Sequence, residues 1–255
     1  MTRIDDVGYG RQFASFYDEI FPKDASADRV AETLSGLVGG SGTALELGVG
    51  TGRIALPLAA RLGSVVGVDS SLEMLERLRA AIGDTGAHVE AVHGDLRGYA
   101  DDRSYDLVYA VCGTLSMLLD AEEQRQAVRH MAERVAPGGH LVIETHNPSG
   151  VLSMADGRST ATFFVPYPEP DSGLLTSWML NQEHALWHAS HVWLANGTFR
   201  IGAEVSRLTT PDEVDSYAQE AGLEPSHRFA DWLKAPYAAR SPMFVAIYRK
   251  PNPSR

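Results

Sequence analysis

The sequence has a single cysteine, Cys112, and no apolar run near the ~20 residues that a membrane-spanning helix needs. One cysteine cannot form an internal disulfide, which is consistent with a reducing compartment. The N-terminal segment MTRIDDVGYGRQ lacks the apolar core of a secretion signal. We therefore expect a soluble, cytoplasmic protein with no membrane partner.

Basic residues are also scarce. The chain carries 22 Lys and Arg against 33 Asp and Glu, a formal net charge of −11, and no cluster of basic residues stands out. Such a charge repels phosphate backbones, so nucleic acid is an unfavourable partner. The acidity also has a simpler explanation, because it keeps many cytoplasmic proteins soluble.

Residues 43–147 alternate between strand and helix patterns, which predicts a parallel sheet covered by helices on both faces. Strands are expected at 43–47, 65–68, 89–92, 105–111 and 140–145, and helices near 54–62, 71–82 and 121–135. Pro57 predicts a late start or a kink in the first of these helices. Pro137 and the two glycines after it predict a helix stop and a turn.

The segments on either side of this core differ in character. Residues 1–42 are expected to form a helical lid with an aromatic stripe of Phe13, Phe16, Tyr17 and Phe21, a pattern more typical of core packing than of ligand contact. Residues 150–207 are rich in aromatic and β-branched residues and predict an antiparallel insertion with a hairpin turn at Asn196-Gly197. Residues 208–255 return to the main domain of residues 1–149 with one helix and two closing strands.

The segment ELGVGTG, residues 46–52, links the first strand to the first helix. Glycines at 48 and 50 let the backbone approach a ligand closely. A dinucleotide site has the spacing Gly-x-Gly-x-x-Gly, with a pyrophosphate at the helix N-terminus. Here Arg53 occupies the third glycine position, which argues against a dinucleotide.

Three acidic residues lie at the carboxyl ends of the predicted strands, next to the turns. Asp69, at the end of the second strand, can accept both hydroxyls of a ribose. Asp95, at the end of the third strand, can accept from an adenine amino group, with Leu96 against the ring. Glu46, just before the glycine turn, can attract an ammonium or sulfonium group. The pattern predicts an adenosine-type ligand that carries a positive charge.

The segments ALELGVGTGR, VVGVDSSLEML, VHGDLRGY, YDLVYAVCGTLSML and APGGHLVIETHNP together resemble the successive motifs of class I S-adenosylmethionine-dependent methyltransferases. The resemblance covers roughly residues 30–147 and the closing strands, and the ordered set is more specific than any one motif. It implies a Rossmann-like α/β fold with a seven-stranded, mostly parallel sheet whose last strand, MFVAIYRK, is antiparallel. The segment FYDEIF and the β-rich insertion resemble, more loosely, enzymes that methylate amino sugars or antibiotic scaffolds.

The resemblance also assigns roles to residues. In the family the glycine turn contacts the methionine part of the cofactor, the acid of the second strand binds the ribose, and the acid after the third strand binds adenine. A tyrosine in the N-terminal segment encloses the methionine end. The expected cofactor-binding residues are Tyr17, Glu46, Gly48, Gly50, Arg53, Asp69, Ser70, Met74, Asp95, Leu96 and Cys112.

The candidate catalytic residues are His146 and Tyr17. The end of the fifth strand supplies Glu144, His146 and Asn147, and a neutral imidazole can accept a proton or orient the acceptor. The alternative for His146 is a hydrogen bond to a loop carbonyl, and the alternative for Tyr17 is ordinary packing. Arg53 either pairs with the cofactor's carboxylate or is an exposed arginine. Cys112 fits a small buried apolar residue better than a nucleophile.

His184, His188 and His191 raise the question of a metal site. Strand alternation sends His184 and His188 to one face and His191 to the other, and no carboxylate or cysteine completes a ligand set. We therefore expect no metal. The insertion is expected to form a wall over the pocket or a subunit contact, which would give a homodimer.

The sequence thus favours an enzyme that transfers a methyl group from S-adenosylmethionine to a nitrogen or oxygen of a small molecule. Two alternatives remain at this point. One is a nicotinamide-dependent oxidoreductase, disfavoured by the glycine spacing and by the lack of a Tyr-x-x-x-Lys pair. The other is a non-catalytic protein that binds S-adenosylmethionine.

Overall fold

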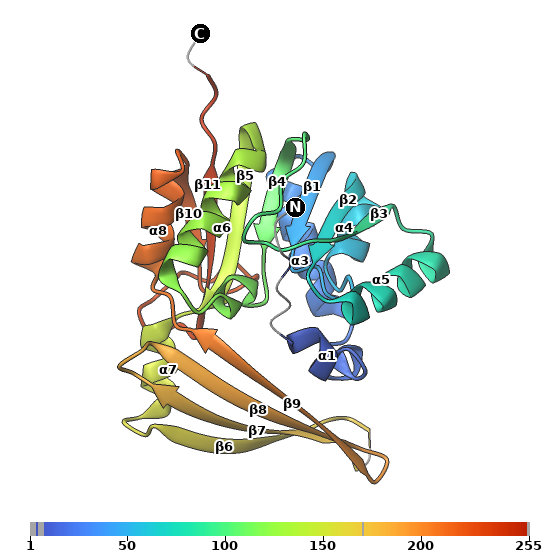
Figure 1. The fold of residues 1–255 in the computed structure, drawn as a ribbon, viewed down its shortest axis with the longest axis vertical. Coiled ribbons are helices and arrows are strands. Elements are labelled where there is room, and N and C mark those ends of the chain that lie inside the picture. Colours follow the sequence, from blue (N-terminus) through green and yellow to red (C-terminus); the bar gives the residue numbers. More distant parts are fainter. Residues whose placement is uncertain (1–3, 5–7, 170, 254–255) are drawn as a thin grey trace.

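The computed structural model describes residues 4, 8–169 and 171–253. A seven-stranded sheet forms its centre, with the strand order β10-β11-β5-β4-β1-β2-β3 (Figure 1). Its strands are β1 (Gly42–Leu47), β2 (Gly63–Asp69), β3 (Val89–His93), β4 (Tyr105–Ala110), β5 (Val135–His146), β10 (Glu224–Phe229) and β11 (Met243–Arg249). Strand β11 runs antiparallel to both of its neighbours, and the other pairs are parallel. The expected fold and the expected antiparallel last strand are confirmed.

Helices cover both faces of this sheet. They are α3 (Ala25–Leu37), α4 (Ala55–Leu62), α5 (Leu72–Thr85), α6 (Ala121–Arg134) and α8 (Pro211–Glu220). Along β4, Val108 packs in one apolar cluster with α6 and α8, whereas Leu107 and Tyr109 pack in another with α3, α4 and α5. Successive side chains of a strand point to opposite faces, so a strand buried on both sides is apolar throughout.

The strand order reverses next to β1. The chain passes from β1 to β2 and β3 on one side, and then returns to β4 on the other side. A crevice forms at such a switch point, beyond the carboxyl ends of the strands. The glycine turn that follows β1 therefore borders this crevice.

Two local expectations are refined by the structure. Pro57 lies in the first turn of α4, which begins at Ala55. Backbone N–H groups of a first turn have no partner within the helix, so Pro57 costs no hydrogen bond there. The boundary between α6 and β5 was predicted wrongly: β5 begins at Val135, where we expected a turn. The Gly138 N–H donates to the Lys250 carbonyl and the Lys250 N–H donates to the Gly139 carbonyl, both at 2.9 Å, so this segment pairs with the C-terminal end of β11.

The N-terminal aromatic residues do not share one helix. The chain forms two short helices, α1 (Tyr9–Phe13) and α2 (Tyr17–Ile20), with a break between them. Phe13 and Phe16 are buried against Met74 and Trp193, whereas Phe21 is 37% exposed. The stripe is therefore core packing in part only. Of the residues expected in this lid, 1–3 and 5–7 lie outside the described part of the chain.

The insertion forms a second, four-stranded antiparallel sheet beside the first (Figure 1). After α7 (Pro148–Ala155) come β6 (Thr160–Pro166), β7 (Gly173–Asn181), β8 (Leu186–Ala195) and β9 (Thr198–Arg207). The predicted hairpin turn is present between β8 and β9, with positive φ at Asn196 (52°) and Gly197 (70°). This turn pairs Ala195 with Thr198 and so sets the register of both strands.

The two N-terminal helices connect the insertion to the glycine turn. Asp18 of α2 accepts a hydrogen bond from the Thr51 hydroxyl at 2.6 Å. Its neighbour Glu19 accepts from the Trp193 indole at 2.7 Å and from Arg200 at 2.6 Å, both on the insertion sheet. The N-terminal segment is thereby fixed on both sides of the crevice.

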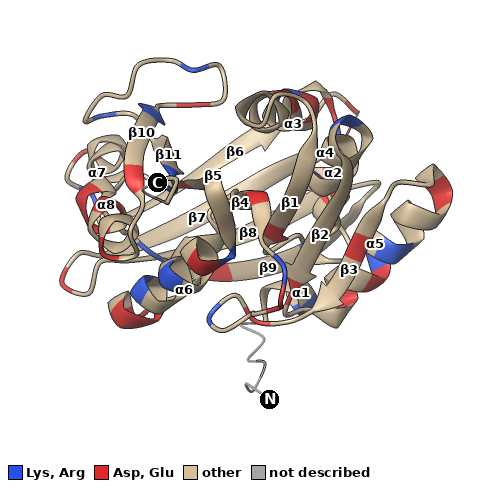
Figure 2. Ribbon diagram, turned by 90° about the horizontal axis from the view of Figure 1, so that it is seen from above, with Lys and Arg blue, Asp and Glu red and all other residues tan. Residues whose placement is uncertain are grey.

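Charged residues are mixed over the outer helices. Figure 2 shows basic residues on α5 and α6 interspersed with acidic ones. Among the described helices, none has both the length and the apolar character required to span a bilayer.

Candidate active site

A cavity lies at the carboxyl ends of β1, β2 and β4 and encloses about 1020 Å³, its open mouth included. All eleven expected cofactor-binding residues line it. The other lining residues are Tyr9, Gly10, Val49, Ile54, Val68, Ser71, Gly94, Arg97, Val111, Thr114, Met117, Leu118 and Glu204.

The glycine turn forms one wall of this cavity. Gly48 and Gly50 have φ angles of 79° and 55°, in the left-handed region that favours glycine. A Cβ on Gly48 would lie 2.4 Å from the Thr114 side chain. A Cβ on Gly50 would meet no described atom within 4 Å, because this residue faces the cavity. Gly48 thus allows close packing, and Gly50 leaves space for a ligand.

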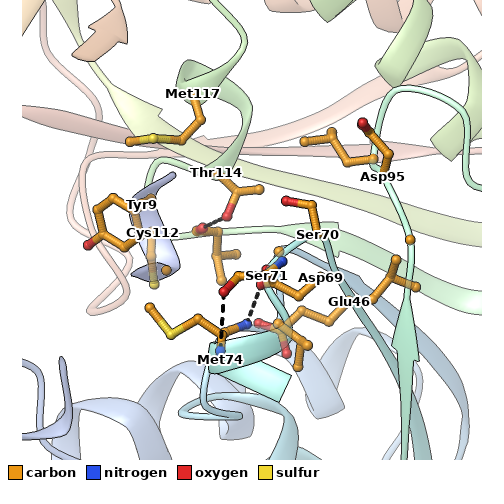
Figure 3. A pocket seen from close by; sticks show the side chains of 18 of the residues that line it. Tyr9, Glu46, Asp69, Ser70, Ser71, Met74, Asp95, Cys112, Thr114 and Met117 are labelled. Carbon is orange, nitrogen blue, oxygen red and sulfur yellow. Dashed lines mark hydrogen bonds between the residues drawn. The ribbon is translucent and has the colours of Figure 1, made fainter. Parts of the chain in front are cut away.

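Asp69 connects the end of β2 to the glycine turn. Its Oδ2 accepts from the Gly50 N–H at 2.8 Å, and its Oδ1 accepts from the Ser71 N–H at 2.9 Å. Each oxygen of a carboxylate has two lone pairs and can accept more than one hydrogen bond. Met74 follows on α5, where its N–H donates to the Ser71 hydroxyl at 3.2 Å (Figure 3).

Asp95 lies on the opposite side of the pocket from Tyr9 and Cys112 (Figure 3). It is 7% exposed and accepts from the backbone N–H of Arg97 at 2.9 Å and from the Arg97 guanidinium. Arg97 also pairs with Glu123 at 3.4 Å. The strand β3 ends at His93, so Asp95 lies in the loop after it rather than at its last residue. Arg97 therefore shares the Asp95 carboxylate with any ligand that approaches it.

Glu46 is buried, with 3% of its surface exposed. Burial raises the pKa of its carboxyl to about 8, although a hydrogen bond from the Tyr109 hydroxyl at 2.8 Å and the charge of Arg53 act in the opposite direction. Among the described residues Glu46 makes no ion pair. A buried carboxylate without a cation is unfavourable, so this position fits a ligand that brings a positive charge.

Arg53 lies between Tyr17 and Cys112. It donates to the Cys112 sulfur at 2.8 Å and forms a hydrogen bond with the Tyr17 hydroxyl. Burial raises the pKa of Tyr17 well above its usual value. Cys112 is exposed to the cavity rather than buried as we expected, but desolvation by the surrounding protein atoms still raises the pKa of its thiol to about 12. Both groups therefore stay protonated at neutral pH, and Arg53 supplies a positive charge beside Glu46.

The loop after β4 carries Cys112 in a left-handed conformation, with φ of 57°. Glu144 stabilises this loop, because its Oε2 accepts from the Cys112 N–H at 2.8 Å and its Oε1 accepts from the Trp232 indole at 2.6 Å. A positive φ on a non-glycine residue stores strain and is common at ligand sites. Strand β4 ends at Ala110, so Cys112 lies two residues beyond the strand, in the loop that follows it.

His146 stands behind the lining of the cavity and is not itself one of the lining residues. Its ring packs edge-on against Trp187 at 4.5 Å, and its Nδ1 has no hydrogen-bond partner among the described residues. Burial lowers the pKa of His146, whereas the nearby charge of Glu204 raises it. Asn147, the next candidate, donates to the carbonyls of Ala239 and Ser241 at 2.9 and 2.7 Å and has a structural place.

The three histidines of the insertion lie apart. His184 is exposed in the turn between β7 and β8, and His188 and His191 belong to β8, where His191 is three residues further along. His191 contacts Thr176 and Glu204. Glu204 itself lines the cavity and was not among the residues predicted from the sequence.

The comparisons with known proteins agree with this geometry. The methyltransferase domain family matches residues 44–139. The cypemycin N-terminal methyltransferase of a Streptomyces species is 30% identical over 215 residues, which are 82% of this chain and 83% of that relative. The chain belongs to the S-adenosylmethionine-dependent methyltransferases. The methyltransferase is an enzyme, and its cofactor is S-adenosylmethionine, as the sequence motifs predicted.

Two further relatives of this methyltransferase are informative. The CcbJ methyltransferase from Streptomyces caelestis has a TM-score of 0.85 and 32% identity, over 97% of this chain and 99% of that one. The dTDP-4-amino-2,3,4,6-tetradeoxy-D-glucose N,N-dimethyltransferase of Saccharopolyspora spinosa is 26% identical over 155 residues, 56% of this chain and 61% of the relative. The CcbJ structure matches almost the whole chain, so its similarity includes the insertion sheet.

The residues of the cavity fit this cofactor. Gly50 leaves room beside the turn, Asp69 places a carboxylate at the end of β2, and Glu46 places a buried carboxyl at the end of β1. Tyr17 and Arg53 lie beside Glu46. The comparisons give no support to an oxidoreductase.

Proposed function

We propose that this methyltransferase transfers the methyl group of S-adenosylmethionine to a nitrogen or oxygen of a small-molecule acceptor, such as an amino sugar or an antibiotic scaffold. One observation carries the proposal: a cavity at the switch point of the sheet is lined both by Asp69 and Asp95 and by the buried carboxyl of Glu46, which makes no ion pair among the described residues. The names of two relatives support the acceptor class, since one methylates cypemycin and the other an amino sugar.

We assign the cofactor-binding roles by position. Asp69 and Ser70 bind the ribose, and Met74 and Leu96 border the adenine together with Asp95. At the other end, Glu46 and Arg53 bind the charged groups of the methionine part, and Gly48 and Gly50 lie along it. Tyr17 closes this end, next to Cys112.

The bound cofactor supplies an electrophilic methyl group on a sulfonium. The residues of the chain hold the acceptor in line with that methyl group and exclude water, and such positioning contributes up to ~7 to 11 kcal/mol. His146 is the candidate that accepts a proton or orients the acceptor, because its lowered pKa leaves the imidazole neutral at physiological pH. Gly113 lies beside the His146 ring, so His146 can reach the acceptor only by way of the space next to this glycine.

A titration followed by an acceptor panel tests this function. S-adenosylhomocysteine should bind with micromolar affinity, and NADH should not bind. Primary amines, amino sugars and hydroxylated analogues are then incubated with S-adenosylmethionine, and products are analysed for the mass of one added methyl group. Binding of NADH in preference to S-adenosylhomocysteine, or the absence of product from every acceptor, would contradict the proposal.

We also propose that the insertion sheet forms the wall over the pocket with one face and a homodimer contact with the other. The outward face carries exposed apolar side chains, with Phe199 at 66% and Ile201 at 58% exposed, and contiguous apolar surface is uncommon on monomers. Light scattering should give the mass of a dimer, and Ile201→Ser with Phe199→Ser should give a monomer. That the protein binds neither nucleic acid nor a membrane stays a prediction.

A further inference from the structure

Glu204 is a carboxylate that the insertion sheet contributes to the cavity. On β9 it pairs with Ala189 of β8, and paired residues of antiparallel strands point to the same face. His191 and Trp187 lie two residues to either side of Ala189 on that strand, so they share this face. Glu204 thus belongs to the inward face, together with two aromatic residues.

His191 holds the Glu204 carboxylate in place. Its Nε2 lies 3.5 Å from Glu204 Oε1, and its Nδ1 lies 3.0 Å from the Thr176 hydroxyl. The ring is further packed edge-on against Phe13 at 5.8 Å. When the Thr176 hydroxyl donates to Nδ1, the Nε2–H points to Glu204 and fixes one of its oxygens.

The other charged residues that line the cavity have different partners. Asp95 pairs with Arg97, Asp69 accepts from the backbone of the glycine turn, and Arg53 bonds Cys112. Glu204 instead lies near Tyr9 and His146, whose pKa values its charge raises.

Two unpaired donors or acceptors lie at the same side. His146 Nδ1 and Trp187 Nε1 are buried and have no hydrogen-bond partner among the described residues. Buried polar atoms are rarely left unpaired in native proteins. Neither residue lines the cavity, so these two atoms stand behind its lining rather than in it.

We propose that Glu204 binds the protonated amine of the methyl acceptor and takes its proton, with His191 as the residue that positions it. This assignment rests on the proposed methyl transfer and narrows its acceptor to amines. A carboxylate in an enclosed site attracts an ammonium group strongly, whereas an alcohol carries no charge to match it. An ammonium also needs to lose a proton before it can attack.

The step balances as follows. One proton moves from the acceptor's R–NH₃⁺ to the Glu204 carboxylate, which leaves a neutral R–NH₂ with a lone pair. A nitrogen–carbon bond forms from this lone pair as the carbon–sulfur bond breaks, and the electron pair of the broken bond stays on sulfur. The products are R–NH₂⁺–CH₃ and S-adenosylhomocysteine, and the proton on Glu204 returns to solvent.

A pair of cofactor analogues tests Glu204 without knowledge of the natural acceptor. In both, nitrogen replaces the sulfur of S-adenosylhomocysteine; one carries a 3-aminopropyl arm and the other a butyl arm of similar length. The arm occupies the acceptor side, so wild-type protein should bind the aminopropyl analogue about tenfold more tightly, as expected for one enclosed charge pair. Glu204→Gln should remove this preference and keep the affinity for S-adenosylhomocysteine.

Further variants separate positioning from folding. His191→Ala should reduce the preference for the aminopropyl arm, and His191→Gln, which keeps an N–H toward Glu204, should restore most of it. Glu183→Gln, an exposed glutamate in the turn between β7 and β8, is the matched control and should behave as wild type. Thermal unfolding checks each variant.

The outcomes distinguish this assignment from the proposed function. Equal affinity of wild-type protein for both arms, or an unchanged preference in folded Glu204→Gln, would overturn the role of Glu204 and leave the proposed function standing. Failure of wild-type protein to bind S-adenosylhomocysteine would instead overturn the proposed function. A variant that fails to fold is replaced by Glu204→Asp, which should weaken the preference because its shorter side chain withdraws the charge.

Discussion

The backbone N–H of Gly50 donates to the carboxylate of Asp69 over 2.8 Å, so the glycine turn after β1 and the end of β2 form one unit. The same carboxylate accepts from the Ser71 N–H at 2.9 Å and thereby fixes the start of α5. Asp69 therefore shapes the turn that we assign to the cofactor, in addition to offering lone pairs to a ribose. Loss of this carboxylate should affect cofactor binding through both effects.

We expect Asp69→Ala to lower the affinity for S-adenosylhomocysteine by about 10- to 100-fold, because hydrogen bonds to a charged group each contribute ~1.5 to 3 kcal/mol. Isothermal titration calorimetry measures the change, and circular dichroism shows whether the fold is intact. Asp84→Ala, at an exposed position of α5, is the control and should bind normally. Unchanged affinity in folded Asp69→Ala would refute the ribose assignment.

The two glycines of the turn should respond differently to substitution. Gly48→Ala places a Cβ 2.4 Å from Thr114 at a φ of 79°, so we expect a loss of about 2 to 4 kcal/mol in the free energy of unfolding. Gly50→Ala meets open space, and its cost of about 1 to 2 kcal/mol comes from the left-handed backbone. Its methyl group takes space in the cavity, so its main effect should be weaker cofactor binding.

Denaturant unfolding and a titration with S-adenosylhomocysteine, both done on each variant, separate these effects. For each variant, the informative quantity is the loss in the free energy of unfolding relative to the loss in cofactor affinity. If Gly50→Ala were destabilised as much as Gly48→Ala and bound the cofactor normally, the assignment of open space beside Gly50 to the ligand would be wrong.

Much of the fold and of the cofactor site could be predicted from the sequence. Strand–helix alternation combined with the family motifs predicted a seven-stranded sheet with an antiparallel last strand. Gly48, Gly50 and Asp69 lie at or just after the ends of strands, where a local pattern specifies them. Asn196-Gly197 specified its turn through the positive φ angles that such a pair tolerates. These features depend on neighbours in the sequence.

The features that escaped prediction depend on distant contacts. Arg97 shares the Asp95 carboxylate. Strand β5 extends back to Val135, which pairs with Tyr105 of β4, and its residues 138 and 139 bond to Lys250. Glu204 could have been found, because the two-residue turn at Asn196-Gly197 pairs residue 189 with 204 and places Glu204 on the face of Trp187 and Trp193. The alternation of β9 alone does not tell which face meets the cavity.

Cys112 should be an unreactive thiol. Desolvation by the surrounding protein atoms and the charge of Glu144 raise its pKa to about 12 although the residue is exposed to the cavity, so the thiolate is a minor form at pH 8. We expect slow alkylation by iodoacetamide at pH 8, and slower alkylation still with S-adenosylhomocysteine bound, because Cys112 lines the cavity. Cys112→Ala should retain methyl transfer. Rapid alkylation of the folded protein would show that the thiol is activated.

His146→Ala should lower turnover and leave the affinity for S-adenosylhomocysteine near that of wild type. With Glu204 as the group that takes the proton of the amine, His146 acts by orienting the acceptor, and it stands behind the cavity lining rather than at the cofactor. The measurement is kcat with an amine found in the acceptor panel. His184→Ala, in the exposed turn of the insertion, is the matched control. Equal turnover of His146→Ala and wild type would remove His146 from the mechanism.

Glu46 should make the stability of the cofactor-free protein depend on pH. Its pKa rises from 4.5 to about 8 on folding because the carboxyl is buried. Between these two values the folded protein keeps a proton that the unfolded chain has released, so the free energy of unfolding falls as the pH rises. Below pH 4.5 and above about pH 8 the two states carry the same charge on this residue, and its slope vanishes.

Glu46→Gln is neutral at every pH and should lose this slope, so its stability relative to wild type should increase from pH 5 to pH 8. Urea unfolding at unit steps of pH measures it, with the exposed Glu76→Gln of α5 as the control. Cofactor binding should also remove the proton that Glu46 holds in the folded protein, because a cation beside this residue favours its carboxylate form.

Calorimetric titrations at pH 7 in two buffers of different ionisation enthalpy count that proton. Release with both S-adenosylmethionine and S-adenosylhomocysteine would identify the amino group as the partner of Glu46, since both ligands carry it. Release with S-adenosylmethionine alone would identify the sulfonium. No proton release with either ligand, together with a wild-type pH profile for Glu46→Gln, would mean that Glu46 does not hold the cofactor's charge.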